Sequence, residues 1–445
     1  MAGNVSNKLN IDFKWLGRQT GSPIERAFYA DIGLAVGEEW LTRLEDQEAS
    51  TVGNHLRACA HRLAIWLAAN WWRLRWEPET QNSWKDADWR IAHSLASAGG
   101  GYVWPNIIFA SDGASMAVVS RPRKKPAPYE PIHYLNQVET HITAMEFERK
   151  VDAFMASIIS RQYSMGITDD SLPELWAEVQ AERSDPDAAQ WRKLEALCGY
   201  DPDEAPSGLV EMLLSDPSHL GGHALEEVAA QGRHDTEQVL RPILALANSS
   251  GKPKAGGFRG IIPALTTRSP ASHSSDLPWQ QGVKFAHQAR QDWNLGRQFI
   301  SNSHLADLLE TKSSAFKDQT KAPSPMPIAL RTRENGKVDF YINQILSTSR
   351  RFATARLIGD QLHFANCGRL FPATTAKTSR QQFQRAFAQE FLCPISALLE
   401  KIQSTEPDEN DISEAADHFQ VSPLMVKTTL VNHGHLERET LNWAD

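Results

Sequence analysis

The chain has few cysteines and lacks the short motifs that identify the common enzyme classes. Its 445 residues include four cysteines, none of them in a CxxC pair. That usage speaks against a disulfide framework or a zinc ribbon and favours reduced, buried thiols. The sequence also has no GxSxG elbow, no Walker A loop and no GxGxxG fingerprint. The hydrolase, NTPase and dehydrogenase classes that carry these motifs are therefore not indicated.

Long apolar runs and a signal-peptide core are missing as well. No stretch reaches the roughly 18 apolar residues that a membrane-spanning helix needs, and the first residues, MAGNVSNKLN, contain no apolar core. With 41% hydrophobic residues and a mean hydropathy of -0.43, the composition is that of a globular protein. We therefore expect a cytoplasmic protein of roughly two to four domains with no membrane contact.

Tryptophan, by contrast, is abundant, and many of the 14 tryptophans lie before residue 105. We interpret them as large apolar anchors of a Trp-rich α+β domain over residues 1–125. Alternation predicts a strand at residues 11–16, and helical periodicity predicts one helix at 54–76 with arginines on its polar side. A hairpin is expected at 102–119. For the 54–76 helix, a packed helix with a solvated basic rim is favoured over a grip on single-stranded nucleic acid.

Charge changes sign along the chain. Residues 146–250 carry 20 acidic and 8 basic side chains, whereas residues 251–389 carry 20 basic and 8 acidic ones. We predict an acidic helical domain at 126–250 and a glycine- and serine-rich linker at 251–277. Two interpretations stay open: the acidic region docks on the basic region, or the basic region faces a polyanion such as nucleic acid.

Residues 350–394 are the most informative stretch. Apolar residues at helical spacing predict a helix at 348–362 and a second helix at 379–390, which Pro394 ends. Upstream of both, residues 328–343 form the clearest hairpin pattern in the chain. The stretch therefore predicts two buried helices that follow a small β element.

At these residues the chain resembles the ImmA/IrrE metallopeptidase family. Residues 351–355, RFATA, are similar to the lead-in to the family's HExxH helix, and residues 387–394, FAQEFLCP, are similar to the end of its second helix, ExxANxFAxxLLxP. The resemblance covers about 278–435. The family's chemical positions hold other side chains: Arg356 for the first zinc histidine, Leu357 for the catalytic glutamate, Asp360 for the second histidine, Gln381 for the acidic ligand and Arg385 for the following asparagine.

These replacements imply a scaffold from which the reaction has been removed. In HExxH, two histidines on one helical face bind one zinc ion, and the glutamate takes a proton from the bound water. Arginine stays cationic and offers no lone pair, so Arg356 opposes metal binding, and Leu357 accepts no proton. The resemblance thus implies no cofactor, no metal, no catalytic residue and a groove that holds a partner protein. The predicted partner-binding residues are Arg351, Arg356, Asp360, Gln381 and Arg385.

The expected fold combines these predictions. We predict a multidomain α+β protein, mainly helical with small antiparallel β elements. The resemblance implies a zincin-like helical domain with a β-hairpin at residues 278–403, followed by a helix-turn-helix-like tail at 404–445. The second helix of this tail starts with Leu424, Met425 and Val426, which favours packing over DNA reading.

The expected function is binding or regulation without catalysis. The resemblance implies a bacterial defence, stress-response or mobile-element system. One alternative is an accessory subunit of a nucleic-acid-binding complex that uses the basic region at 251–389. Another is a metallohydrolase with a relocated site; Asp360, His363 and Cys367 have a suitable spacing but no fourth ligand. The candidate nucleic-acid contacts are Arg121, Arg123, Lys124, Lys125, Arg350, Arg369, Lys377 and Arg380.

Overall fold

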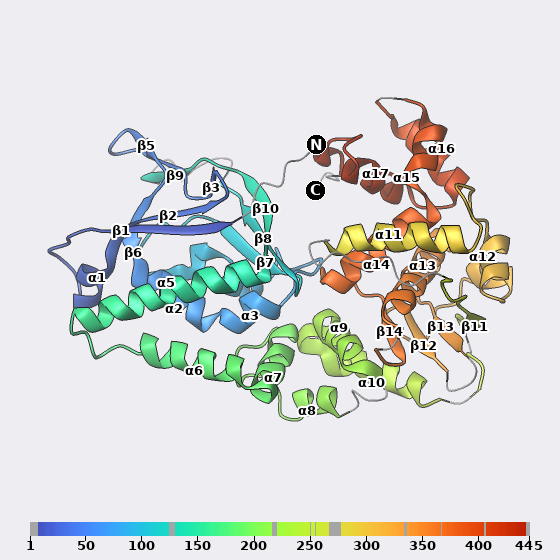
Figure 1. The fold of residues 1–445 in the computed structure, drawn as a ribbon, viewed down its shortest axis with the longest axis horizontal. Coiled ribbons are helices and arrows are strands. Elements are labelled where there is room, and N and C mark those ends of the chain that lie inside the picture. Colours follow the sequence, from blue (N-terminus) through green and yellow to red (C-terminus); the bar gives the residue numbers. More distant parts are fainter. Residues whose placement is uncertain are drawn as a thin grey trace. The chain divides into compact units, whose positions relative to one another are not determined.

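The chain has an α+β fold with several small antiparallel sheets, as the sequence predicted (Figure 1). A computed structural model describes residues 8–123, 130–215, 220–249, 251–253, 255–266, 277–332, 336–365, 367–404 and 406–441. The chain divides into two compact units, residues 1–210 and 211–445. Each unit has its own hydrophobic core.

Three small sheets form the β part of the first unit. The first has the order β1-β2-β3, and a fourth strand, β6, also pairs with β2. The second has the order β10-β8-β7, and the third has the order β5-β4-β9. The strands are β1 (Leu9–Trp15), β2 (Tyr29–Val36), β3 (Glu39–Trp40), β4 (Leu44–Asp46), β5 (Thr51–Gly53), β6 (Leu56–Cys59), β7 (Ile107–Ser111), β8 (Ser115–Ser120), β9 (Ile132–Tyr134) and β10 (Val138–Thr143).

Helices pack on these sheets around a core that is rich in aromatic side chains. The long helix α5 buries Phe147, Val151 and Phe154, and Phe147 stacks on Trp71 of α3. The helices are α1 (Pro23–Phe28), α2 (Ala60–Ala69), α3 (Trp71–Trp76), α4 (Ala87–His93), α5 (Ala144–Ser164), α6 (Leu172–Ser184) and α7 (Pro186–Leu197), with α8 (Leu209–Leu214) at the boundary between the units.

Two features of this unit differ from the sequence-based predictions. The predicted helix at 54–76 is a strand followed by two helices, because residues 56–59 pair with β2 and the side chain of Asn70 bonds to Trp66 O between α2 and α3. The predicted domain boundary at residue 125 lies inside the unit, since β10 pairs with β8 and α5 packs into the same core. Periodicity alone does not distinguish a short buried strand from a helix end.

The second unit contains one sheet of order β11-β13-β12-β14. Its two central strands are those of the predicted hairpin, whose turn residues 333–335 lie outside the described residues. The predicted linker at 251–277 contains a strand, β11, which pairs with β13. The strands are β11 (Gly257–Ile261), β12 (Ile328–Arg331), β13 (Lys337–Tyr341) and β14 (Leu370–Pro372).

Helices make up most of the second unit. The two helices predicted in residues 350–394 are present as α13 and α14, and the predicted helix-turn-helix-like pair is present as α16 and α17. Within the described residues, no helix combines the length and apolar character that crossing a membrane requires. The helices are α9 (Gly222–Gly232), α10 (Thr236–Ala247), α11 (Pro278–Asp292), α12 (Asn302–Leu308), α13 (Ser347–His363), α14 (Ser379–Leu392), α15 (Ile395–Ile402), α16 (Glu409–Phe419) and α17 (Pro423–Asn432).

Candidate functional site

Helices α13 and α14 pack closely enough for their polar side chains to meet. A Cβ atom on Gly359 of α13 would lie 2.5 Å from ring carbons of Phe387, which is fully buried on α14. Glycine at position 359 therefore allows a separation that a larger residue would prevent. This packing brings the two series of predicted site residues onto facing helices.

Arg356 of α13 and Gln381 of α14 are in direct contact. Arg356 Nη2 donates a hydrogen bond to Gln381 Oε1 and a second one to the carbonyl oxygen of Thr374, at 2.7 Å. Gln381 Oε1 also accepts from the backbone N–H of Thr374, at 2.9 Å. The two positions that the resemblance equates with the first histidine and the acidic ligand are thus adjacent.

Asp360 has a different partner, Arg380. Arg380 Nε and Nη2 donate to the two carboxylate oxygens of Asp360 at 2.8 and 2.7 Å. Both side chains are buried. A bidentate pair of this kind satisfies the carboxylate with charge-assisted hydrogen bonds, so Asp360 is already neutralised inside the protein.

Helix α9 contributes a carboxylate that the sequence analysis did not select. Glu227 accepts hydrogen bonds from Thr378 Oγ1 at 2.7 and 2.9 Å and from Gln381 Nε2 at 2.8 Å. Thr378 also caps α14, because its Oγ1 accepts from the N–H of Gln381. No motif in the sequence points to Glu227, since its partners lie about 150 residues further along the chain.

These side chains form what we call the buried polar centre: Glu227, Arg356, Asp360, Thr378, Arg380 and Gln381. Burial, and then repulsion from Arg385, lower the pKa of Arg356 to about 9, so its guanidinium group is still charged at neutral pH. Burial raises the pKa of Glu227 above its ordinary value. Arg385 lies beside the centre and donates to the carbonyl oxygens of Thr374, Thr375 and Ala376 at 3.0 to 3.2 Å.

The centre does not fit a zinc ion. Three guanidinium groups, on Arg356, Arg380 and Arg385, face two carboxyl groups, on Asp360 and Glu227, so a further cation would add to an excess of positive charge. No group of three or more histidine, cysteine or acidic residues in the described parts of the chain is arranged to hold a metal.

Arg350 and Arg351 serve the packing of the second unit. Arg351 is fully buried and donates to the carbonyl oxygens of Gln420 and Ile300 and to the side chain of Asn302, at 2.5 to 3.1 Å. Arg350 is also buried, and its partners among the described residues are carbonyl oxygens of the surrounding loops and strands. Neither side chain is exposed in a groove or available to phosphate, which corrects the roles predicted for them.

The other predicted nucleic-acid contacts are distributed over both units. In the first unit, the guanidinium carbon of Arg121 lies 4.2 Å from the ring centre of Trp84, and Arg123 forms an ion pair with Glu130. In the second unit, Arg369 donates to the carbonyl oxygen of Arg331, and Lys377 is exposed. Arg380 is buried in the polar centre, and Lys124 and Lys125 lie outside the described residues.

The spacing of Asp360, His363 and Cys367 does not produce a metal site. Helix α13 ends at His363, whose ring stacks on Phe383 with centres 4.4 Å apart. Cys367 follows beyond the helix end and is exposed. The three side chains therefore do not share a helical face.

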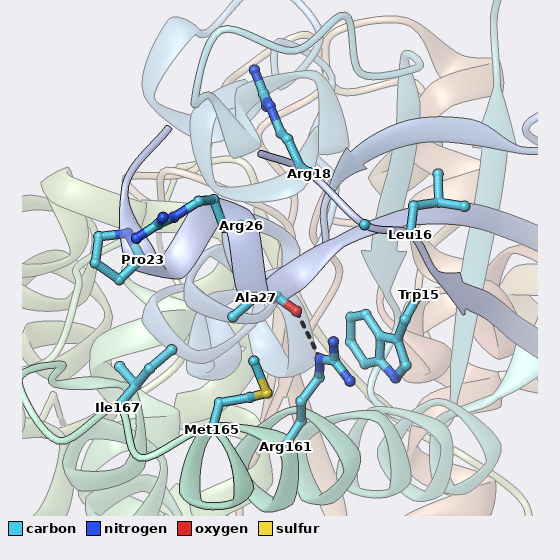
Figure 2. Close-up of a pocket in the computed structure, with 10 residues that line it drawn as sticks. Trp15, Leu16, Arg18, Pro23, Arg26, Ala27, Arg161, Met165 and Ile167 are labelled. Atoms are coloured by element: carbon cyan, nitrogen blue, oxygen red, sulfur yellow. Dashed lines mark hydrogen bonds between the residues drawn. The ribbon is translucent and has the colours of Figure 1, made fainter. Parts of the chain in front are cut away.

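A pocket in the first unit was not predicted from the sequence (Figure 2). It has a volume of about 640 Å³ and lies where the end of β1, the segment after it, α1 and the end of α5 meet. Its lining combines residues 15–27 with residues 161–167 from much later in the chain, which explains why no local motif indicated it. The lining residues are Trp15, Leu16, Gly17, Arg18, Pro23, Arg26, Ala27, Arg161, Met165 and Ile167.

Comparison with known proteins adds no relative. No protein-family model, no curated protein and no solved structure matches this chain.

Proposed function

We propose that residues 278–403 are a degenerate, zincin-like ImmA/IrrE-type domain that binds a protein partner and does not cleave it. The contact between Arg356 and Gln381 carries this proposal. Two ligands of one ion must lie close together, and the hydrogen bond between these two side chains, from facing helices, supports such an origin. A regulatory role in a bacterial defence, stress-response or mobile-element system follows from the same resemblance.

The chemistry of the centre supports binding over cleavage. Leu357, at the position of the catalytic glutamate, is fully buried and accepts no proton. Arg356 is cationic and already donates to two acceptors inside the protein. Peptide hydrolysis by a zincin requires both a metal-bound water and a base next to it, and neither residue supplies these functions.

We infer that the partner contacts the outer face of the loop between β14 and α14. On the inner side of this loop, Thr374 and Thr378 bond to the buried polar centre. Thr375 and Lys377 between them are exposed. Since the five predicted groove residues are largely occupied by internal hydrogen bonds, an incoming chain would meet this exposed loop before it met them.

The resemblance is tested by restoring the motif. The variant with Arg356→His, Leu357→Glu, Asp360→His and Gln381→Glu is expected to bind about one zinc ion per chain by elemental analysis. The same variant without Gln381→Glu serves as the control and should bind zinc more weakly. A restored variant that keeps its circular dichroism spectrum and binds no zinc would refute the family resemblance.

The binding role is tested by affinity capture from the native host. We expect the wild-type chain to retain a protein partner after nuclease treatment, and Lys377→Glu to lose it. Lys312→Glu, an exposed lysine before a different short helix, is the matched control and should keep the partner. Capture that disappears on nuclease treatment and weakens steeply with salt would instead favour the nucleic-acid alternative.

A further inference from the structure

Strand β1 is an edge of the first sheet (Figure 1). It pairs with β2 along its whole length, from Leu9 opposite Val36 to Trp15 opposite Ala30. Strands β3 and β6 take the other side of β2, and no strand in the described part of the chain pairs with the outer side of β1. The outer side of such a strand presents backbone N–H and C=O groups that another strand can bind.

The hydrogen bonds at the two ends of β1 show which backbone groups face this open edge. The N–H of Gly37 donates to the carbonyl oxygen of Lys8 at 3.0 Å, and the N–H of Leu16 donates to that of Tyr29 at 2.9 Å. Because bonded pairs alternate along an antiparallel ladder, the even-numbered residues of β1 bond to β2 and the odd-numbered ones point away. The central N–H and C=O groups that point away belong to Ile11, Phe13 and Trp15.

The side chains of these three residues also mark the edge as open. Each is only partly buried. Their partners across the β1-β2 ladder are at most 2% exposed, and these are Leu34, Ile32 and Ala30. Apolar area therefore remains accessible at the edge, and pairing with a further strand would remove part of it from water.

Strand β1 lacks two features that commonly protect an edge strand. Its sequence, LNIDFKW, contains no proline, and its pairing with β2 runs without a bulge. Its outer face carries one charge of each sign, on Asp12 and Lys14, and both residues are exposed. Asp12 lies 3.0 Å from His55 but keeps 55% of its side chain exposed, and Lys14 has no ion pair within the described residues. Both charges are therefore available to an approaching strand.

A second copy of β1 offers matching charges in the right order. In an antiparallel pair with its two-fold axis at Phe13, the backbone of Ile11 bonds to that of Trp15 in the second copy, and Phe13 bonds to Phe13. Asp12 then lies directly opposite Lys14 of the second copy, and the symmetry produces this pair twice. Opposite charges at such positions stabilise a pair of strands.

Other registers lose these charge pairs. With the axis at Ile11, Lys14 would lie opposite Lys8 of the second copy and Asp12 opposite Asn10, so that like charges meet. With the axis at Trp15, most of the paired residues would lie beyond the end of β1. Charge and strand length thus select the register that is centred on Phe13.

We propose that β1 pairs with β1 of a second copy of this chain, so that two first units form one continuous antiparallel sheet. The interface is isologous: backbone hydrogen bonds hold it together, and the pairs of Asp12 with Lys14 set its register. This surface belongs to the first unit and does not depend on the function proposed for the second.

Sedimentation of the full-length chain under reducing conditions tests the proposal. A contact between two strands is small, so we expect a concentration-dependent dimer that is measurable at about 100 μM chain. The variants Asp12→Lys and Lys14→Asp each place like charges opposite each other twice. Each should weaken self-association about tenfold, whereas an equimolar mixture of the two variants should associate as the wild type does, because opposite charges then meet again.

Lys85→Asp is the matched control. Lys85 is likewise exposed in the first unit but lies outside β1, and the substitution changes the net charge as Lys14→Asp does. It should self-associate like the wild type. The proposal is overturned if the wild type stays monomeric at the stated concentration, if either β1 variant associates as well as the wild type, or if the mixture does not associate.

Hydrogen exchange on the wild type gives a second test that needs no substitution. The amide hydrogens of Ile11, Phe13 and Trp15 face the open edge, so they should exchange more slowly in a concentrated sample, in which dimers form, than in a dilute one. Those of Asn10, Asp12 and Lys14 already bond to β2 and should change less. Equal exchange of residues 9–15 at both concentrations would show that β1 is not the contact.

Discussion

At the scale of single residues, Gly359 determines how closely α13 and α14 approach. An added Cβ would lie 2.5 Å from the buried ring of Phe387. Gly359→Ala should therefore destabilise the protein by about 1 to 3 kcal/mol through overpacking, although alanine favours helix by roughly 1 kcal/mol. Gly53→Ala is the control, because nothing lies within 4 Å of a Cβ there. Urea denaturation measures both, and a more stable Gly359→Ala variant would contradict the packing argument.

Glu227 makes stability depend on pH. Burial raises its pKa in the folded protein, so the folded state holds a proton that the unfolded state has released. Stability is then lost as the pH rises from the unfolded pKa, about 4.3, through the raised folded pKa. Glu227→Gln should remove this loss while keeping hydrogen bonds to Thr378 and Gln381.

The measurement is the difference in the free energy of unfolding between Glu227→Gln and the wild type at pH 4.5 and pH 8. We expect the free energy of unfolding of Glu227→Gln to rise relative to that of the wild type at the higher pH. Glu211→Gln, at an exposed position of α8 in the same unit, should show no such change. A wild type that gains stability relative to Glu227→Gln as the pH rises would mean that the carboxylate is stabilised in its charged form.

At the scale of elements, α11 and α14 are joined by a close crossing and an ionic contact. A Cβ on Gly282 of α11 would lie 2.4 Å from the carbonyl oxygen of Phe383. His287 Nε2 lies 2.7 Å from Glu390 Oε1, and the hydrogen bond to this carboxylate raises the pKa of His287. Because the folded pKa is raised, this contact stabilises fully below about pH 6.5 and is lost as the pH rises through the folded value.

His287→Gln should therefore lower stability at pH 6 and have a smaller effect at pH 9. Thermal unfolding at the two pH values measures the change. His304→Gln, on the exposed side of α12, is the control, and its effect on thermal stability should be the same at both pH values. An equal loss for His287→Gln at both pH values would mean that the charge on the imidazole is unimportant.

Which elements the sequence predicts depends on the kind of contact that forms them. Helices α13 and α14 were predicted because their apolar residues recur at helical spacing. Strands β6 and β11 were missed, since each is formed by pairing with a distant strand, at 29–32 and 337–341 respectively. Arg356 and Gln381 were each named as site residues from the sequence, whereas their contact and the contribution of Glu227 required the folded chain.

At the scale of the whole molecule, the two units should report differently on unfolding. Eleven of the fourteen tryptophans lie in residues 1–210, so tryptophan fluorescence follows mainly the first unit. Gly359→Ala lies in the second. Hydrogen exchange in residues 277–432 follows the unfolding of the second unit. By this measure we expect Gly359→Ala to lower the midpoint of thermal unfolding by roughly 2 to 4 °C for each kcal/mol of destabilisation. The midpoint followed by tryptophan fluorescence should shift less. Equal shifts would mean that the units unfold as one.

The position of α9 matters for anyone who shortens this protein. A truncation that starts at residue 251, where composition suggests a linker, would discard the helix that carries Glu227 and Gln231. The hydroxyl of Thr378 and the amide of Gln381 would then lose their acceptor, Glu227. The backbone N–H and the hydroxyl of Thr375 would lose theirs, the side-chain oxygen of Gln231. A fragment meant to keep the C-terminal half intact has to begin ahead of α9.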